Sequence, residues 1–140
     1  MANVFEDVAE FHAKFLLVSD EPPVPKNYTS TEMLRFRTGF LIEESQEHND
    51  AANAGDLVKA IDANLDAIYV AVGNLRMMGV GSILASRLWD IVHRANMAKV
   101  RAERAEDSAR STTFDVIKPP GWVAPDESLR RLLRRHGADV

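Results

Sequence analysis

The chain has 140 residues, a formal net charge of −4 at pH 7 and no cysteine. This acidic balance, with a pI near 5.5, argues against general binding to nucleic acid. The missing cysteines exclude disulfides and thiolate zinc sites, and they are compatible with a reducing compartment such as the cytoplasm. Because 46% of the residues are hydrophobic, a chain of this length is expected to form one domain, residues 1–140, around a real core.

The N-terminal region is interrupted by acidic residues, so it does not have the apolar stretch of a signal peptide. These residues are Glu6, Asp7 and Glu10. The most apolar run, residues 67–72, is far too short to cross a bilayer. We therefore expect a cytoplasmic protein without a membrane partner.

Hydrophobic residues recur at helical spacing along most of the chain, and no segment predicts a convincing strand. A first helix is expected at about residues 4–17, followed by a proline-rich loop at 20–27. Ser30 or Thr31 can cap a second helix, which should end near Gly55. The next residue can cap a third helix.

Asp56 is the expected cap of this third helix, which should run to about residue 78, before Gly79 and Gly81. A fourth helix is expected at 82–105, an ordered loop or tail at 107–127, and a short basic helix at 126–135. The expected fold is all-α: a four-helix bundle (core helices within residues 1–106) and a tail, 107–140, that carries the short C-terminal helix.

In the second expected helix, carboxylates occupy the positions at which the apolar stripe would be expected to continue. At about 100° per residue, one arc of this helix holds Met33, Phe36, Phe40, Glu44 and Glu47, with Glu43 at its edge. Carboxylates that face a core are costly unless something positive meets them. A divalent cation is the simplest partner for several carboxylates at once, so this arc indicates a metal site.

The third expected helix is apolar on most sides, which is typical of a helix inside a bundle or at a subunit interface. One face holds Leu57, Ile61, Leu65, Ile68, Val72 and Leu75. We therefore expect a homodimer or a dimer of dimers. Phe11, Phe15 and Phe36 are expected in the core.

Asp62 and Asp66 lie four residues apart on another face of the third helix, and their like charges repel unless they share a cation. Taken alone, pairing of both aspartates with arginines is an equally good interpretation. The glutamates of the second helix favour a shared cation over pairing with arginines, because oxygen ligands from two facing helices suit Mg²⁺ or Mn²⁺.

Several segments, taken in order, resemble the MazG-like all-α nucleoside triphosphate pyrophosphohydrolases. This superfamily includes the phosphoribosyl-ATP pyrophosphohydrolases and the dimeric dUTPases. The segments are Glu43-Glu44 with Glu47, the Gly55-Asp56 turn, Asp62 and Asp66 with Tyr69, and Asn96 with Lys99. The stretch from Lys118 to Trp122 and the Glu10-Phe11-His12 sequence are similar to the subgroup nearest the MazG-like dUTPases. The resemblance spans roughly residues 8–126.

This resemblance implies a MazG-type helical bundle that hydrolyses a (d)NTP, dUTP among the candidates, to the monophosphate and pyrophosphate. It implies Mg²⁺ or Mn²⁺ held by Glu44, Glu47 and Asp66, with Asp62 as a weaker fourth ligand. Glu43 is expected to be a ligand or the general base. The substrate-binding residues are expected to be Asn96, Lys99, Lys118 and Trp122.

Simpler interpretations stand beside these roles. Without the resemblance, Asn96 and Lys99 are better read as a solvated helix end, and Trp122 as a side chain that pins its loop to the core. His12, His48 and His93 are expected to be structural or surface residues. The basic set Arg130, Arg131, Arg134 and Arg135 is expected to be a solvated helix face, with an acidic partner subunit as the alternative.

One departure from the family pattern concerns the third helix. The family usually has a glutamate three residues before the aspartate, where this chain has Ala63. Asp62, one residue earlier, could reach the same ion by a rotated approach. The alternative function is therefore a non-catalytic helical dimer that binds nucleotide or metal, with activity lost at Ala63.

Overall fold

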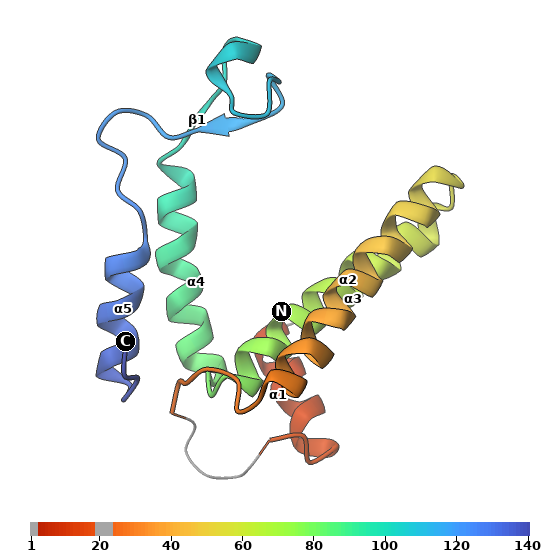
Figure 1. The fold of residues 1–140 in the computed structure, drawn as a ribbon, viewed down its shortest axis with the longest axis vertical. Helices are drawn as coiled ribbons and strands as arrows, with labels where there is room; N and C mark the ends of the chain where they lie inside the picture. Colours follow the sequence, from red (N-terminus) through yellow and green to blue (C-terminus); the bar gives the residue numbers. More distant parts are fainter. Residues whose placement is uncertain (1–2, 19–23) are drawn as a thin grey trace.

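The computed structural model describes residues 3–18 and 24–140, and most of this part of the chain is helical (Figure 1). Its α-helices are α1 (Val4–Lys14), α2 (Thr31–Asn53), α3 (Leu57–Met77), α4 (Ser82–Met97) and α5 (Asp126–Arg135). A 3₁₀ turn, η1 (Ala105–Asp107), and two strands of two residues each, β1 (Val100–Arg101) and β2 (Val116–Ile117), lie between α4 and α5. The all-α prediction is confirmed; five residues of the expected proline-rich loop, 19–23, lie outside the described residues.

The first four helices pack as an open bundle. Helices α2 and α3 form a hairpin in which they lie side by side, and α1 contacts both α3 and α4 (Figure 1). Helix α5 lies beside α4, and the two pairs of helices diverge as two arms (Figure 1). A small core at their junction contains Val80, Leu84 and Ala85, which are buried, with Phe5, Leu75, Leu88, Leu132 and Leu133 packed around them.

Local capping fixes the start of the two longest helices where the sequence predicts it. The Ser30 side chain accepts a hydrogen bond from the backbone N–H of Met33 (3.0 Å) at the start of α2. The Asp56 side chain accepts one from the N–H of Lys59 (3.1 Å) at the start of α3. The predicted bounds of α5 are also confirmed, whereas α1 ends at Lys14, three residues early.

Helix α4 ends at Met97, eight residues before the predicted end. The chain beyond it pairs with a segment further along: Val100 lies opposite Ile117, and Arg101 lies opposite Val116, in an antiparallel ribbon. Ala102, whose N–H donates to Asp115 O (3.0 Å), is only 1% exposed. This non-local pairing overrides the helical periodicity, so the prediction that no strand forms was wrong at these four residues.

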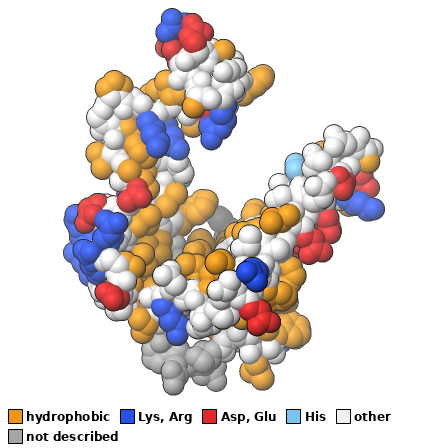
Figure 2. Space-filling model, viewed as in Figure 1, with side chains coloured by type: hydrophobic (Ala, Val, Ile, Leu, Met, Phe, Trp, Pro, Cys, Tyr) orange, Lys and Arg blue, Asp and Glu red, His pale blue; other side chains and the backbone are white. Residues whose placement is uncertain are grey.

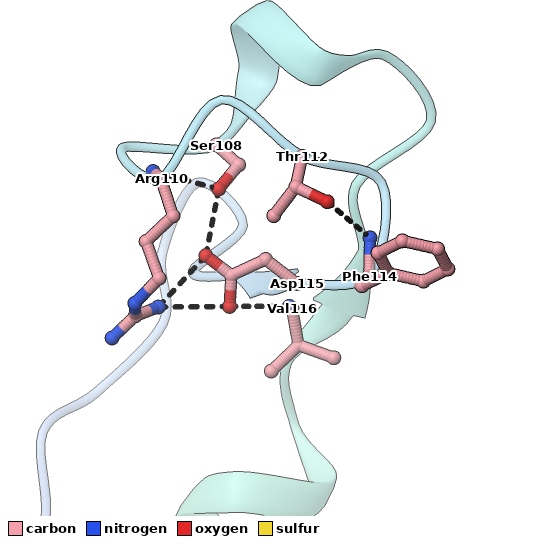
Figure 3. Close-up of polar contacts among 6 residues, drawn as sticks. All are labelled: Ser108, Arg110, Thr112, Phe114, Asp115 and Val116. Carbon is pink, nitrogen blue, oxygen red and sulfur yellow. Dashed lines mark hydrogen bonds and ion pairs between the residues drawn. The ribbon is translucent and has the colours of Figure 1, made fainter. Parts of the chain in front are cut away.

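The loop that closes this ribbon is held by its own polar contacts (Figure 3). The carboxylate of Asp115 accepts hydrogen bonds from Ser108 Oγ (2.7 Å) and Arg110 Nη1 (2.8 Å). The hydroxyl of Thr112 accepts one from the N–H of Phe114 (3.1 Å). The ring of Phe114 points away from this cluster and is 93% exposed (Figure 3).

Large apolar side chains are unusually exposed in the single chain. Phe11, Phe15 and Phe36, which were expected in the core, are 39%, 52% and 57% exposed. The prediction that these three side chains are buried was wrong within a single chain, because the open bundle covers only part of the apolar faces of α1 and α2. The N-terminal part of the apolar face of α3 is open in the same way: Leu57, Ile61, Leu65 and Ile68 are all exposed, whereas Val72 is buried.

Within the described residues, no single helix is long and apolar enough to cross a membrane. Helices α3 and α4, which meet at 115°, satisfy the criteria of length and composition only when they are taken together.

Candidate functional site

The carboxylates predicted as metal ligands lie on the facing helices of the α2–α3 hairpin. Glu43, Glu44 and Glu47 belong to α2, and Asp62 and Asp66 belong to α3. The tight turn at residues 54–56 makes the two helices antiparallel, so these five residues lie at a similar level of the hairpin. We call these five residues the carboxylate cluster.

Glu44 lies at the centre of the carboxylate cluster. Its side chain is half-buried, and its Oε2 atom is enclosed without a hydrogen-bond partner among the described residues. Burial raises the pKa of Glu44, and the charges of Glu47, Asp66, Glu43 and Asp62, in decreasing order, raise it further. These effects indicate that each of the other four carboxylates lies near Glu44.

A polar bridge ties the two helices together next to the carboxylate cluster. The Asn64 amide Nδ2 donates to Nδ1 of His48 (2.7 Å) across the hairpin, and also contacts Ala60 O (2.6 Å) one turn back along α3. Nδ1 of His48 also lies 3.3 Å from Ala60 O. His48 therefore connects α2 and α3, which agrees with its expected structural role.

The donor set of the carboxylate cluster suits a hard cation. Every candidate ligand is a carboxylate oxygen, the chemistry that Mg²⁺ and Mn²⁺ prefer, and the enclosed Oε2 of Glu44 has no other partner. In the part of the chain that the structure describes, no three acidic or histidine side chains converge closely enough to hold an ion. Carboxylates repel one another without a cation, and Glu43, Glu47, Asp62 and Asp66 are exposed and free to turn toward water.

The position at which the family pattern has a glutamate is closed to solvent. Ala63 is 3% exposed, in the part of α3 that packs against the rest of the chain, whereas its neighbour Asp62 is exposed. Asp62 therefore lies on the solvent side of α3 rather than at the helix interface.

The residues predicted to bind substrate lie together at the C-terminal end of α4. The indole Nε1 of Trp122 donates to Ala95 O (2.7 Å), so this side chain pins the loop before α5 to α4. The ammonium groups of Lys118 and Lys99 lie 4.7 Å and 5.9 Å from the centre of the Trp122 ring. Asn96 is exposed on the last turn of α4. We call Asn96, Lys99, Lys118 and Trp122 the Trp122 cluster.

A single chain does not bring the two clusters together. The carboxylate cluster lies on the arm formed by α2 and α3, and the Trp122 cluster lies at the far end of the arm formed by α4 and α5 (Figure 1). No substantial packing between α2 and α4 joins the two arms within the described residues.

A buried basic group on the same hairpin was not foreseen from the sequence. Arg37, which is 8% exposed, donates from Nε to Asn74 Oδ1 (2.7 Å) and from Nη2 to Val70 O (3.2 Å). It precedes Glu44 by seven residues, or about two helical turns, so both face the seam between α2 and α3. The spacing of seven residues between Arg37 and Glu44 was the one feature of the sequence that could have predicted that Arg37 faces α3.

His12 completes this basic group from α1. It is 2% exposed, which agrees with the expected structural role, and its Nδ1 has no partner among the described residues. Burial lowers the pKa of His12, and the nearby charges of Arg37 and Arg76 lower it further, so the ring is neutral at pH 7. His93, by contrast, is exposed on α4, as expected of a surface residue.

Comparison with known proteins matches more than half of the chain to one family. Residues 8–96, more than half of the chain, match the model of the family described as phosphoribosyl-ATP pyrophosphohydrolase. The matched region contains the whole carboxylate cluster and ends at Asn96, before Lys99, Lys118 and Trp122. A search of curated proteins found no match to this chain.

Proposed function

Because the chain belongs to the phosphoribosyl-ATP pyrophosphohydrolase family, within the MazG-like superfamily, we propose that it hydrolyses a nucleoside triphosphate between the α- and β-phosphates. Membership itself implies a pyrophosphohydrolase that acts on a nucleotide. The finer proposal is cleavage of a (d)NTP, with dUTP as a candidate, to the monophosphate and pyrophosphate. We favour this class over phosphoribosyl-ATP because the Lys118–Trp122 tail resembles the dUTPase-like subgroup.

The observation that carries this proposal is the environment of Glu44. A half-buried carboxylate with an enclosed, unpartnered oxygen and four acidic neighbours needs a positive partner. Glu44, Glu47 and Asp66, with Asp62 as the fourth, would hold Mg²⁺ or Mn²⁺. When bound, the cation supplies the charge that screens carboxylates from the substrate phosphates and polarises the phosphoryl group.

Glu43 is the proposed general base. It is exposed at the edge of the carboxylate cluster, and its charge contributes to the raised pKa of Glu44. Its carboxylate can therefore orient the attacking water and accept a proton from it as the water attacks the α-phosphorus. The leaving group is pyrophosphate, and the monophosphate keeps the oxygen that the water provides.

A second copy of the chain would complete the site. The Trp122 cluster is proposed to bind the nucleotide, with Lys99 and Lys118 contacting phosphate and Asn96 contacting sugar or phosphate. In one chain these residues are on the other arm from the carboxylates (Figure 1). The exposed apolar face of α3 supports a homodimer or a dimer of dimers, in which the arms of two copies meet.

The proposal is tested by pyrophosphate release from a panel of nucleotides with Mg²⁺ or Mn²⁺. We expect turnover of at least one (d)NTP and a loss of about 100-fold or more in Glu44→Gln, on the scale of removing an essential electrostatic group. Glu32→Gln, which changes an exposed glutamate in the first turn of α2, is the matched control and should keep parental turnover.

The alternative function rests on Ala63. Because this buried position lacks the family glutamate, the chain would bind nucleotide or metal as a helical dimer without hydrolysis. Binding of Mg²⁺ that depends on Glu44, with no pyrophosphate released from any nucleotide, would favour this alternative. Binding accompanied by turnover would exclude it.

A further inference from the structure

A groove separates α4 from α5 and the loop that precedes α5. Its volume is about 660 Å³, and one wall is formed by Trp122 and the prolines around it. Three arginines line it: Arg94 from α4, and Arg131 and Arg135 from α5. In Figure 2, Lys and Arg side chains gather over this arm. A groove of this volume is within the range of about 300–1,000 Å³ found for small-molecule sites.

The arginines of α5 are divided between two environments. Arg130 and Arg134 do not line the groove: Arg130 forms an ion pair with Glu127 (2.8 Å), and Arg134 donates to the backbone oxygen of Val140. On the groove face, Arg131 and Arg135 form no ion pair with any acidic residue that the structure describes. Arg94, across the groove, has none either within those residues.

This arrangement has an electrostatic cost in the absence of a ligand. Arg131 and Arg135 are four residues apart on one helix, where like charges repel. A bound anion would remove the repulsion, because guanidinium groups match the geometry of phosphate oxygens and form strong charge-assisted hydrogen bonds to them. The hydroxyl of Ser128, which also lines the groove, adds a neutral donor.

We propose that the groove between α4 and α5 binds the phosphate chain of a small polyphosphate through Arg94, Arg131 and Arg135, independently of the carboxylate cluster. The positive charge comes from the protein itself, so binding needs no divalent cation. The phosphate chain can belong to inorganic pyrophosphate or to a nucleotide. A nucleotide would in addition place its base and sugar near Trp122, which forms the adjoining wall.

Calorimetric titration of the full chain in excess EDTA tests this site. We expect saturable binding of inorganic pyrophosphate and of a non-hydrolysable nucleoside triphosphate. The double variant Arg131→Gln/Arg135→Gln should weaken both by at least about tenfold, as expected when two charge-assisted contacts are lost. The matched control Arg130→Gln/Arg134→Gln removes the same charge from two arginines of α5 that do not line the groove, and it should retain parental affinity.

The outcomes are distinct. A nucleoside triphosphate that binds tighter than inorganic tripolyphosphate, which has the same number of phosphates, identifies a nucleotide as the ligand, whereas equal affinities identify the phosphate chain alone. The proposal is overturned if no saturable heat is seen, or if both double variants weaken binding equally, since that would be diffuse attraction to α5. The two proposals have separate readouts. Pyrophosphate release by Glu44→Gln tests the proposed hydrolysis, whereas binding by Arg131→Gln/Arg135→Gln in EDTA tests the groove, so failure of one proposal does not entail failure of the other.

Discussion

At the scale of single residues, Glu44 has the environment on which the proposed chemistry depends. Its four acidic neighbours and its enclosed Oε2 atom make the negative charge of its carboxylate unfavourable in the metal-free protein. The same features make it a strong ligand once a cation is present, because the cation reverses the sign of the local potential.

The raised pKa of Glu44 predicts a pH dependence of stability. Its ordinary pKa is 4.5 and its pKa in the folded protein is higher, so the folded state holds the proton more tightly than the unfolded state. The free energy of unfolding in EDTA should therefore fall as pH rises through the window that begins near 4.5 and ends at the raised value. Urea unfolding at several pH values measures this slope.

Glu44→Gln should flatten that slope, because the amide has no proton to lose. Mg²⁺ should oppose the slope in the parent chain, because a bound cation favours the ionised carboxylate. Glu32→Gln serves as the control. A slope that is unchanged in Glu44→Gln would show that another group causes the pH dependence.

Asp62 decides whether this chain retains the family chemistry without a glutamate at position 63. If Asp62 acts in its place, Asp62→Asn should lower turnover and Mg²⁺ affinity about as much as Asp66→Asn, since each removes one ligand charge. Outer partners of metal sites typically change affinity by about 10–100-fold, and a direct ligand should reach at least that range. Isothermal titration with Mg²⁺ and pyrophosphate release measure the two effects.

The control for this comparison is Asp50→Asn, which changes an exposed aspartate of α2 that accepts a hydrogen bond from Gln46 (2.7 Å). Parental Mg²⁺ affinity and turnover in Asp62→Asn would mean that Asp62 is a surface residue of α3 that does not bind the metal.

At the scale of the elements, α1, α2 and α3 are locked together by close packing at Gly73. A Cβ atom at this position would lie 2.7 Å from Nη2 of Arg37 and 3.0 Å from Nε2 of His12. Neither neighbour can move away easily, because Arg37 is held by Asn74 and Val70, and His12 is buried. The glycine is thus required by the approach of α1 and α2 to α3.

We therefore predict that Gly73→Ala destabilises the protein by about 1–3 kcal/mol, the usual cost of overpacking. Gly39→Ala is the matched control, since it also lies inside a helix but has no atom within 4 Å of the added Cβ. Alanine should stabilise α2 there by up to about 1 kcal/mol because it favours helix more than glycine does. Equal effects of the two substitutions in urea unfolding would contradict the packing explanation.

At the scale of the whole molecule, the open bundle leaves its largest apolar surfaces to solvent. Five large apolar side chains of α3, from Leu57 to Ile68, are each 49% to 77% exposed. A surface of this kind on a single chain is typical of an interface with another chain. The proposed site shared between the two clusters would also need a second copy of the chain.

We predict that the parent chain is a dimer or larger oligomer at micromolar concentration by multi-angle light scattering. Ile61→Asp places a charge on the exposed apolar face of α3 and should shift the protein to monomers, because burying an unpaired charge at an interface is costly. Phe114→Asp, at the exposed tip of the ribbon, is the control and should leave the oligomer intact. A monomeric parent chain would rule out the dimer and the shared site.

The sequence alone determined the features that depend on neighbouring residues. The starts of α2 and α3 follow from Ser30 and Asp56, whose side chains cap the next turn, and the helical period follows from apolar residues three and four apart. The grouping of Glu44 with Asp66 follows as well, because a short turn between two long helices fixes their register.

Only the tertiary structure decided the features that depend on residues far apart in the chain. Helix α4 ends early because residues 100–101 pair with 116–117, and Arg37 is buried because Gly73 lets α1 and α2 approach α3 closely. The separation of the Trp122 cluster from the carboxylates is likewise set by how the arms diverge (Figure 1). Such contacts have no local signature, since their energy comes from packing between segments whose meeting no short stretch of sequence specifies.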